Sequence, residues 1–375
     1  MASVFLYGTL RHAPLLAAVL GREDARLSAA TLTGHAVAWA EGQAFPLIHA
    51  REGARADGLL LDGLSPEDLA RLEFYEGGFD YALRGIEVEA GGRTLPTQAW
   101  FPAPGAPWVP GAAFALEDWV ARWGEINTAA AAAAMTLLGR VPAAELGWRL
   151  PPMQARAAST LRAAGMPAPA TLRRAGGRDE IRTLDMRRPY DAFFAVAEAD
   201  LRFPRFDGGQ SNAVTRAAFV MADAVSVLPY DPARDRVLLI EQLRIGPWIR
   251  GDRHVFSLEA IAGRIDPGET PEEAARREAV EEAGLALGPM ELVARYYPSP
   301  AGVTEYLFSY VACCDLPDGA DGPGGAADEH EDIRSHLVSF DDFLGLIRSG
   351  EVENAPLILS GYWLLANRER LRAAG

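Results

Sequence analysis

Residues 263–285 read GRIDPGETPEEAARREAVEEAGL, and this stretch decides the fold of the C-terminal half of the chain. Glu278, Glu281 and Glu282 stand at positions i, i+3 and i+4, so a helix directs all three carboxylates from one face. Like charges at this spacing repel each other and weaken an isolated helix. A divalent cation among them explains the clustering, and carboxylate oxygens without His or Cys suit a hard ion such as Mg²⁺.

Signals at both ends predict the same helix. Thr270 is a good N-cap, and Glu273 completes a Thr-x-x-Glu capping box. Gly284 is suited to end the helix in the left-handed conformation. The run 263–268 before it is rich in Gly and Pro and is typical of a loop. A solvated acidic surface helix is the alternative interpretation, but solubility does not explain the flanking glycines.

The segment resembles the Nudix box, a 23-residue pattern G-x5-E-x7-R-E-U-x-E-E-x-G-U in which U is aliphatic, and every fixed position matches. The resemblance implies an α/β/α sandwich with a mixed sheet, which binds Mg²⁺ or Mn²⁺ and hydrolyses a nucleoside diphosphate linked to another group. The implied metal ligands are the backbone carbonyl of Ala262 and the side chains of Glu278, Glu281 and Glu282. The implied structural positions are Gly263, Glu269, Arg277 and Gly284, with Glu269 and Arg277 as an ion pair.

From about Tyr190 to Leu371 the chain resembles the ADP-ribose pyrophosphatase subgroup. Pro300 lies fifteen residues after Leu285, the spacing that marks ADP-ribose-directed members. The resemblance implies a substrate site that includes Arg244, Glu259, Pro300 and Glu305. For Arg244 a strand-end ion pair with Glu241 or Glu259 is an equally open interpretation.

Residues 329–334, EHEDIR, resemble the catalytic loop of that subgroup. Glu331 falls at the position of the general base, and His330 stands where Asn is usual. With Glu282 as the second catalytic residue, the implied reaction converts ADP-ribose or a related ADP-sugar to AMP and ribose 5-phosphate. The resemblance also implies a homodimer in which residues 190–220 take part. The alternative is a non-catalytic ADP-ribose sensor or scaffold.

The N-terminal part carries different motifs. Residues 4–11 read VFLYGTLR, a strand that breaks at a glycine and frees backbone N–H groups for an anion. Residues 72–77 read LEFYEG and follow a helix-like stretch, 66–72. Together these motifs resemble the γ-glutamylcyclotransferase-like (AIG2-like) family, whose fold is a small β-barrel with helices. The resemblance implies Glu76 as general acid/base, with a substrate loop formed by Tyr7, Gly8, Thr9 and Leu10.

Two points qualify that second resemblance. Residues 76–81 read EGGFDY and depart from the commoner Glu-Gly-Tyr-Pro form. A domain kept for binding or assembly, without activity, is therefore the alternative. A fusion of these two domains also resembles a Nudix subgroup linked by name to tellurite resistance.

Composition bounds the remaining possibilities. The chain has 375 residues, 49% of them hydrophobic, which predicts two globular domains. The net charge of −15 argues against broad binding to nucleic acid or anionic membranes. The absence of Lys excludes Schiff-base and P-loop chemistry based on that residue. Two adjacent cysteines, no leader-like N-terminus and no long apolar run predict a reducing, cytoplasmic setting.

The stretch 151–177 is rich in Pro, Ala, Gly and Arg, and we expect a linker there. The two resemblances then imply a γ-glutamylcyclotransferase-like domain over 1–150 and a Nudix domain over 178–375. The first domain reads as short strands followed by an Ala-rich helix at 128–138. In the second domain we expect strands at 222–229, 236–244, 290–297 and 306–313, and closing helices at 340–349 and 355–370.

Overall fold

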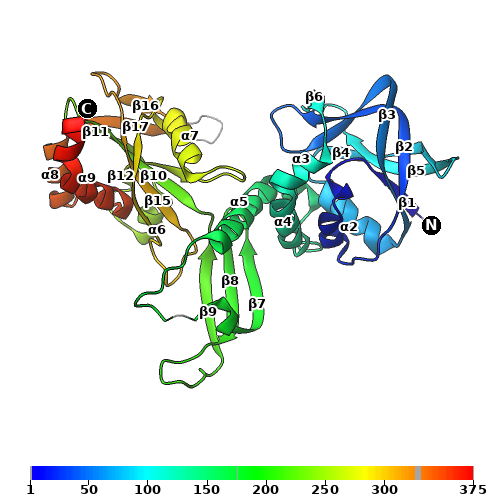
Figure 1. Cartoon of the computed structure of the whole chain (residues 1–375), viewed down its shortest axis with the longest axis horizontal. Helices are drawn as coiled ribbons and strands as arrows, with labels where there is room; N and C mark the ends of the chain where they lie inside the picture. Colours follow the sequence, from blue (N-terminus) through cyan, green and yellow to red (C-terminus); the bar gives the residue numbers. More distant parts are fainter. Residues whose placement is uncertain (1, 175, 326–330, 375) are drawn as a thin grey trace. The chain divides into compact units, whose positions relative to one another are not determined.

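A computed structural model describes residues 2–174, 176–325 and 331–374 (Figure 1). Contacts divide the chain into two compact units, Met1–Met166 and Pro167–Gly375, and each is described by itself. The expected domain boundary at 150 falls inside helix α5 (Leu146–Gly165), which belongs to the first unit. Leu150 and Met153, on either side of the expected start of the linker, are both buried in the core of that unit, so the connection between the units begins only at Pro167.

The first unit contains a six-stranded sheet in the order β3-β1-β5-β4-β2-β6. Its strands are β1 (Ala2–Leu6), β2 (Arg26–Ala40), β3 (Pro46–Leu64), β4 (Tyr81–Ala90), β5 (Arg93–Pro102) and β6 (Pro110–Ala113). An additional β2–β3 pairing closes the sheet into the expected small barrel. The expectation of short strands was wrong for β2 and β3. A register shift next to Gly34, whose φ is +73°, lets the long β2 bend around the barrel.

Helices cover one side of this barrel. They are α1 (Ala13–Leu20), α2 (Pro66–Glu76), α3 (Leu116–Trp119), α4 (Glu125–Met135) and α5, with short turns at Thr9–Arg11, Val120–Gly124 and Ala143–Glu145. The predicted Ala-rich helix is α4, and its buried Ala130, Ala131 and Ala134 allow close helix contacts. They pack in one core with side chains of α1 and α2. A second cluster, including Phe5 and Leu60, fills the barrel.

The second unit contains an eight-stranded mixed sheet and a separate three-stranded sheet, β7-β8-β9. The larger sheet follows the path β14-β15-β10-β11-β17-β16, while β12 pairs with β11 and β13 pairs with β10. The strands are β7 (Arg182–Asp191), β8 (Ala195–Arg202), β9 (Val214–Val220), β10 (Ala224–Asp231), β11 (Arg236–Leu243), β12 (Phe256–Glu259), β13 (Ile261–Arg264), β14 (Met290–Tyr296), β15 (Leu307–Cys313), β16 (Gly322–Gly324) and β17 (Ile333–Ser339). The strands predicted at 222–229, 236–244, 290–297 and 306–313 are thus confirmed.

Helices cover both faces of the larger sheet, as the α/β/α expectation requires (Figure 1). They are α6 (Ile245–Arg250), α7 (Pro271–Ala283), α8 (Phe340–Ser349) and α9 (Ala355–Ala374), with a short turn at Arg178–Glu180. Along β10, Leu228 and Tyr230 join the core beneath α8 and α9. Because strand residues alternate, the buried Val225 and Val227 face the other side, where α7 packs. Across the described ranges, no helix is long and apolar enough to cross a membrane.

Candidate active site

The local sequence explains why α7 begins and ends where it does. The Thr270 hydroxyl accepts the Glu273 N–H at 3.2 Å, and the Glu273 carboxylate accepts the Thr270 N–H at 2.8 Å, so the predicted capping box is confirmed. Gly284 ends the helix with a φ of +62°. Ala275 and Ala279 are fully buried, and α7 packs against β10 and β13. These contacts hold the acidic face of the helix beside the loop that precedes it.

Glu282 is the most unusual group on that face. It is only 1% exposed, and its carboxylate accepts one backbone N–H, from Ala262 at 3.1 Å. Burial, together with the negative charges of Glu278 and Glu331, raises its pKa to about 9 against the lowering effects of the Ala262 N–H and Arg244. A carboxylate in such a place is ionised only when a positive charge stabilises it. The residues around Glu282 therefore suit a bound cation.

The Arg277 guanidinium lies among the same carboxylates. Its Nε donates to Glu269 at 2.9 Å, which confirms the predicted ion pair. Its Nη1 donates to both Glu278 and Glu281, at 2.8 Å each. Within the described residues no group of three His, Cys, Asp or Glu side chains is already arranged to hold a metal ion. Arg277 thus contacts Glu269, Glu278 and Glu281 at once.

Gly263 provides the space for Glu278. A Cβ atom at position 263 would lie 1.9 Å from Oε1 of Glu278, so any other residue there requires this carboxylate to leave its position beside strand β13. The predicted ligands are all oxygen atoms: the carboxylates of Glu278, Glu281 and Glu282 and the backbone carbonyl of Ala262, which lies in β13. Such oxygens fit a hard divalent cation.

Arg244 and Glu259 form a two-bond ion pair at the ends of β11 and β12. Nε and Nη2 of Arg244 donate to the two carboxylate oxygens at 3.0 and 2.6 Å, and Glu259 is 5% exposed. The ion-pair interpretation of Arg244 is thus confirmed for Glu259, whereas Glu241 contacts His336 at 2.8 Å. Arg244 also acts electrostatically on Glu282 and Glu305, so the structure brings these groups to one region.

For the other residues of the expected Nudix site, the structure gives a position or an electrostatic effect. Burial raises the pKa of Glu305, and the nearby Arg244 lowers it. Pro300 lies in an exposed turn after β14. Glu331 precedes β17, and its charge acts on Glu282. His330, singled out because Asn is usual there, lies outside the described residues.

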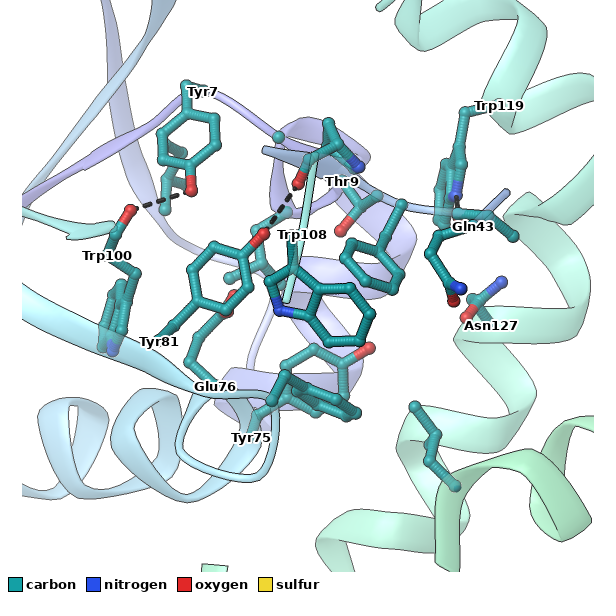
Figure 2. A pocket seen from close by; sticks show the side chains of 18 of the residues that line it. Tyr7, Thr9, Gln43, Tyr75, Glu76, Tyr81, Trp100, Trp108, Trp119 and Asn127 are labelled. Carbon is teal, nitrogen blue, oxygen red and sulfur yellow. Dashed lines mark hydrogen bonds between the residues drawn. The ribbon is translucent and has the colours of Figure 1, made fainter. Parts of the chain in front are cut away.

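The first unit contains a pocket of about 310 Å³. Tyr7, Gly8, Thr9, Leu10 and Glu76 all line it, so the structure brings together every residue expected there. Burial raises the pKa of Glu76 to about 7, although the side chain opens onto the pocket and is partly accessible. Figure 2 shows Glu76, Tyr7 and Tyr81 at one end and Gln43 and Asn127 at the other, with the Trp108 ring between them.

Hydrogen bonds hold the Glu76 end in place. The Tyr7 hydroxyl donates to the Trp100 carbonyl at 2.8 Å, and the Tyr81 hydroxyl donates to the Pro46 carbonyl at 3.1 Å (Figure 2). No hydrogen bond to the Glu76 carboxyl is present within the part of the chain that the structure describes. Glu76 is therefore a half-buried acid whose carboxyl opens onto the pocket and is available to a ligand.

Comparisons with known proteins agree with this division. Residues 221–359 match the family model described as NUDIX domain, and residues 4–121 match the one described as Gamma-glutamyl cyclotransferase, AIG2-like. A protein of Escherichia coli (strain K12) named ADP-ribose pyrophosphatase is 35% identical over 196 residues, which cover 52% of this chain and 93% of that protein. The chain belongs to the Nudix family.

Two further relatives match the Nudix domain. The ADP-ribose pyrophosphatase of Haemophilus influenzae is 32% identical over 197 residues, covering 52% of this chain and 90% of that protein. The GDP-mannose pyrophosphatase of Enterobacter sp. (strain 638) is 30% identical over 144 residues, covering 38% of this chain and 74% of that protein. Nudix hydrolases typically need divalent metal ions, and the oxygen donors on α7 suit one.

The residues of the Nudix box could be found from the sequence because they lie within one short segment, 263–285. Sequence reasoning missed several lining residues of the N-terminal pocket, which come from separate elements: Gln43, Tyr81, Trp108, Asn127 and Gln154. One signal was present in the sequence. Gly78 departs from the common motif, and a Cβ there would lie 2.8 Å from Cβ of Leu146 at the start of α5. The departure thus marks a helix packed against the Glu76 turn.

Proposed function

We propose that the Nudix domain hydrolyses the diphosphate of ADP-ribose, or of a related ADP-sugar, to AMP and ribose 5-phosphate with Mg²⁺ or Mn²⁺. The observation that carries this proposal is the buried carboxylate of Glu282. It accepts one hydrogen bond, from the Ala262 N–H, and the negative charges of Glu278 and Glu331 act on it. Among the residues that the structure describes, no cation forms an ion pair with this carboxylate, and Arg244 acts on it only through its charge. The choice of substrate is supported by the names of two relatives, both ADP-ribose pyrophosphatases, because this chain matches nearly the whole length of each.

Each residue would have a separate task. Glu278, Glu281 and Glu282 would hold the cation, which when bound neutralises the diphosphate and lowers the pKa of the attacking water. Glu331 would accept the proton of that water, a contribution of roughly 10²- to 10⁴-fold in rate. Arg244, held by Glu259, would present its remaining N–H groups to the ribose or a phosphate.

The test is AMP release from ADP-ribose by the full chain, with GDP-mannose as the competing substrate. We expect Glu282→Gln to lower kcat by about 100-fold or more. Glu272→Gln is the matched control, because Glu272 lies on the first turn of the same helix and contacts Tyr310 instead. Full activity in Glu282→Gln, or no AMP release by the unmodified protein, would overturn the proposal.

The homodimer belongs to the same proposal. Four large apolar residues of the sheet β7-β8-β9 are each about half exposed: Leu184, Met186, Tyr190 and Phe219. Single exposed apolar residues are ordinary, but four on one small sheet suit a partner surface. Light scattering should give the mass of a dimer, and Met186→Glu should shift it toward the monomer.

The pocket of the first unit supports a second candidate function, γ-glutamyl cyclotransfer. The specific observation is Glu76, a buried carboxyl with a pKa of about 7 in a pocket with the Tyr7–Leu10 loop. Such a group accepts and returns a proton near neutral pH. The α-amino nitrogen of a γ-glutamyl amide would attack its own γ-carbonyl carbon. The amide C–N bond would break, the proton would pass through Glu76 to the leaving amine, and 5-oxoproline would form.

Release of 5-oxoproline measures this activity directly. We expect Glu76→Gln to abolish it and Glu73→Gln, an exposed position on the same helix α2, to leave it unchanged. Release that persists in Glu76→Gln would remove the proposed role of this residue.

A further inference from the structure

Helix α5 forms one wall of the N-terminal pocket, although it lies outside the residues 4–121 that match the cyclotransferase family model. Gly147, Leu150, Pro151 and Gln154 of α5 line the pocket, and α4 adds Asn127. The helix is seated by a contact between two glycines. A Cβ at Gly147 would lie 2.6 Å from the Gly78 carbonyl oxygen, and one at Gly78 would lie 3.0 Å from the Gly147 nitrogen.

The contact between Gly78 and Gly147 links helix α5 to the end of the pocket that holds Glu76. Gly78 lies two residues after Glu76, so the turn that carries the carboxyl also anchors α5. A larger residue at position 78 would push α5 away from the turn and open the pocket. The wall is therefore a built part of the pocket of this chain.

The wall offers hydrogen-bond acceptors to a ligand. Gln154 Nε2 donates one N–H to Asn127 Oδ1 at 2.7 Å, and Asn127 Nδ2 donates one to the Trp123 carbonyl at 3.0 Å, so each amide keeps a second N–H and Gln154 also presents its carbonyl oxygen. Pro151 has no N–H, so the Gly147 carbonyl cannot receive the usual i+4 helical bond. A neutral ligand hydroxyl beside this wall can donate a hydrogen bond to these oxygens.

The rest of the pocket is aromatic. Phe45, Phe79, Trp108 and Trp119 line it, and no Lys, Arg or His side chain is among its described lining residues. The buried Trp108 Nε1 has no hydrogen-bond partner in the described structure. In Figure 2 this ring nitrogen faces the Glu76 side of the pocket. A ligand carbonyl between Trp108 and Glu76 would satisfy this donor.

We propose that α4 and α5 make this pocket selective for γ-glutamyl amides whose amine side is an uncharged aromatic group with a hydroxyl donor, and that they reject amine sides bearing a carboxylate. The proposal rests on the second proposed function. The aromatic rings would stack on the aryl group, and the Gln154 and Gly147 oxygens would accept its hydroxyl. A carboxylate at this wall would meet no cationic side chain among the described lining residues, and a charge without a counter-ion is costly in a buried site. The pocket volume suits one small molecule.

The experiment compares two ligands that differ only in one carboxylate, γ-glutamyl-tyramine and γ-glutamyl-tyrosine. Calorimetry on the full chain carrying Glu76→Gln measures binding without turnover, and 5-oxoproline release by the unmodified chain measures activity. We expect the tyramine derivative to bind roughly 10- to 100-fold more tightly. Gln154→Arg adds a cation to the wall and should reverse or abolish that preference. Ala163→Arg adds the same charge at an exposed position of α5 and should not.

Each outcome separates the two proposals. A preference for the tyramine derivative that Gln154→Arg removes supports the inference, even if neither compound is turned over and the cyclotransferase proposal fails. Equal binding, preferred binding of the tyrosine derivative, or no binding of either overturns the inference. Release of 5-oxoproline with no discrimination leaves the cyclotransferase proposal standing and overturns only the selectivity.

Discussion

At the scale of single residues, two buried carboxyls have raised pKa values for the same physical reason. Glu282 and Glu76 both lose hydration on burial, and their pKa values rise to about 9 and about 7. Their surroundings differ in the charge that is available. Glu282 lies among other carboxylates that suit a cation, whereas Glu76 faces aromatic rings and tyrosine hydroxyls. One carboxyl is thus suited to holding a metal ion, and the other to moving a proton.

Glu76 should make the stability of the first unit depend on pH. Its folded pKa of about 7 exceeds the ordinary value of 4.5, so the folded state holds this proton more tightly than the unfolded state. Stability from this group is therefore full below about pH 4.5 and declines as pH rises to about 7. We measure the free energy of unfolding of the Glu76→Gln variant and of the unmodified protein at pH 5.5 and pH 8. The difference between them should change in favour of the variant at the higher pH, by on the order of 2 kcal/mol. An unchanged difference between the two pH values contradicts the assignment.

The Arg244–Glu259 pair should depend on the shape of the guanidinium. Its two bonds hold a carboxylate that is 5% exposed, and lysine cannot form both. We expect Arg244→Lys to lower the free energy of unfolding by about 1 kcal/mol. The control is Arg370→Lys, because the Arg370–Glu291 pair also has two bonds, from Nη1 and Nη2, but both of its side chains are about half exposed and it should contribute little. Equal losses in denaturant titrations of the two variants would show that burial of the pair is unimportant.

At the scale of elements, the sequence predicted best where local signals agree. Helix α7 could be predicted in full because its cap, its alanines and its terminal glycine lie within one segment. Strands β10 and β11 follow from their continuous apolar runs. The linker predicted over 151–177, a stretch rich in Pro, Ala, Gly and Arg, overlaps most of helix α5, whose buried residues pack in the core of the first unit. The pocket wall could not be predicted, since Trp108 and Gln154 meet only through the folded barrel and helices.

The junction of β13 with α7 should tolerate no side chain at position 263. The Cβ of Gly263→Ala would lie 1.9 Å from Oε1 of Glu278, so strand and helix must separate or the carboxylate must move. We expect at least about a 10-fold weaker affinity for Mn²⁺, measured by electron paramagnetic resonance without substrate, with the fold retained. Gly246→Ala is the control, because nothing lies within 4 Å of an added Cβ there. Unaltered Mn²⁺ affinity in Gly263→Ala would separate Glu278 from the metal site.

At the scale of the whole molecule, each unit has a hydrophobic core of its own. The cores of the first unit lie within residues 2–157, and the core under α8 and α9 lies within residues 228–371. We therefore expect chains 1–166 and 167–375, divided where the contacts divide, to fold separately. The second chain should release AMP from ADP-ribose with a kcat within about 3-fold of the full chain, because every proposed Nudix residue lies in it. Circular dichroism checks that each piece is folded, and activity that returns only when the two pieces are mixed would mean that the Nudix site needs the first unit.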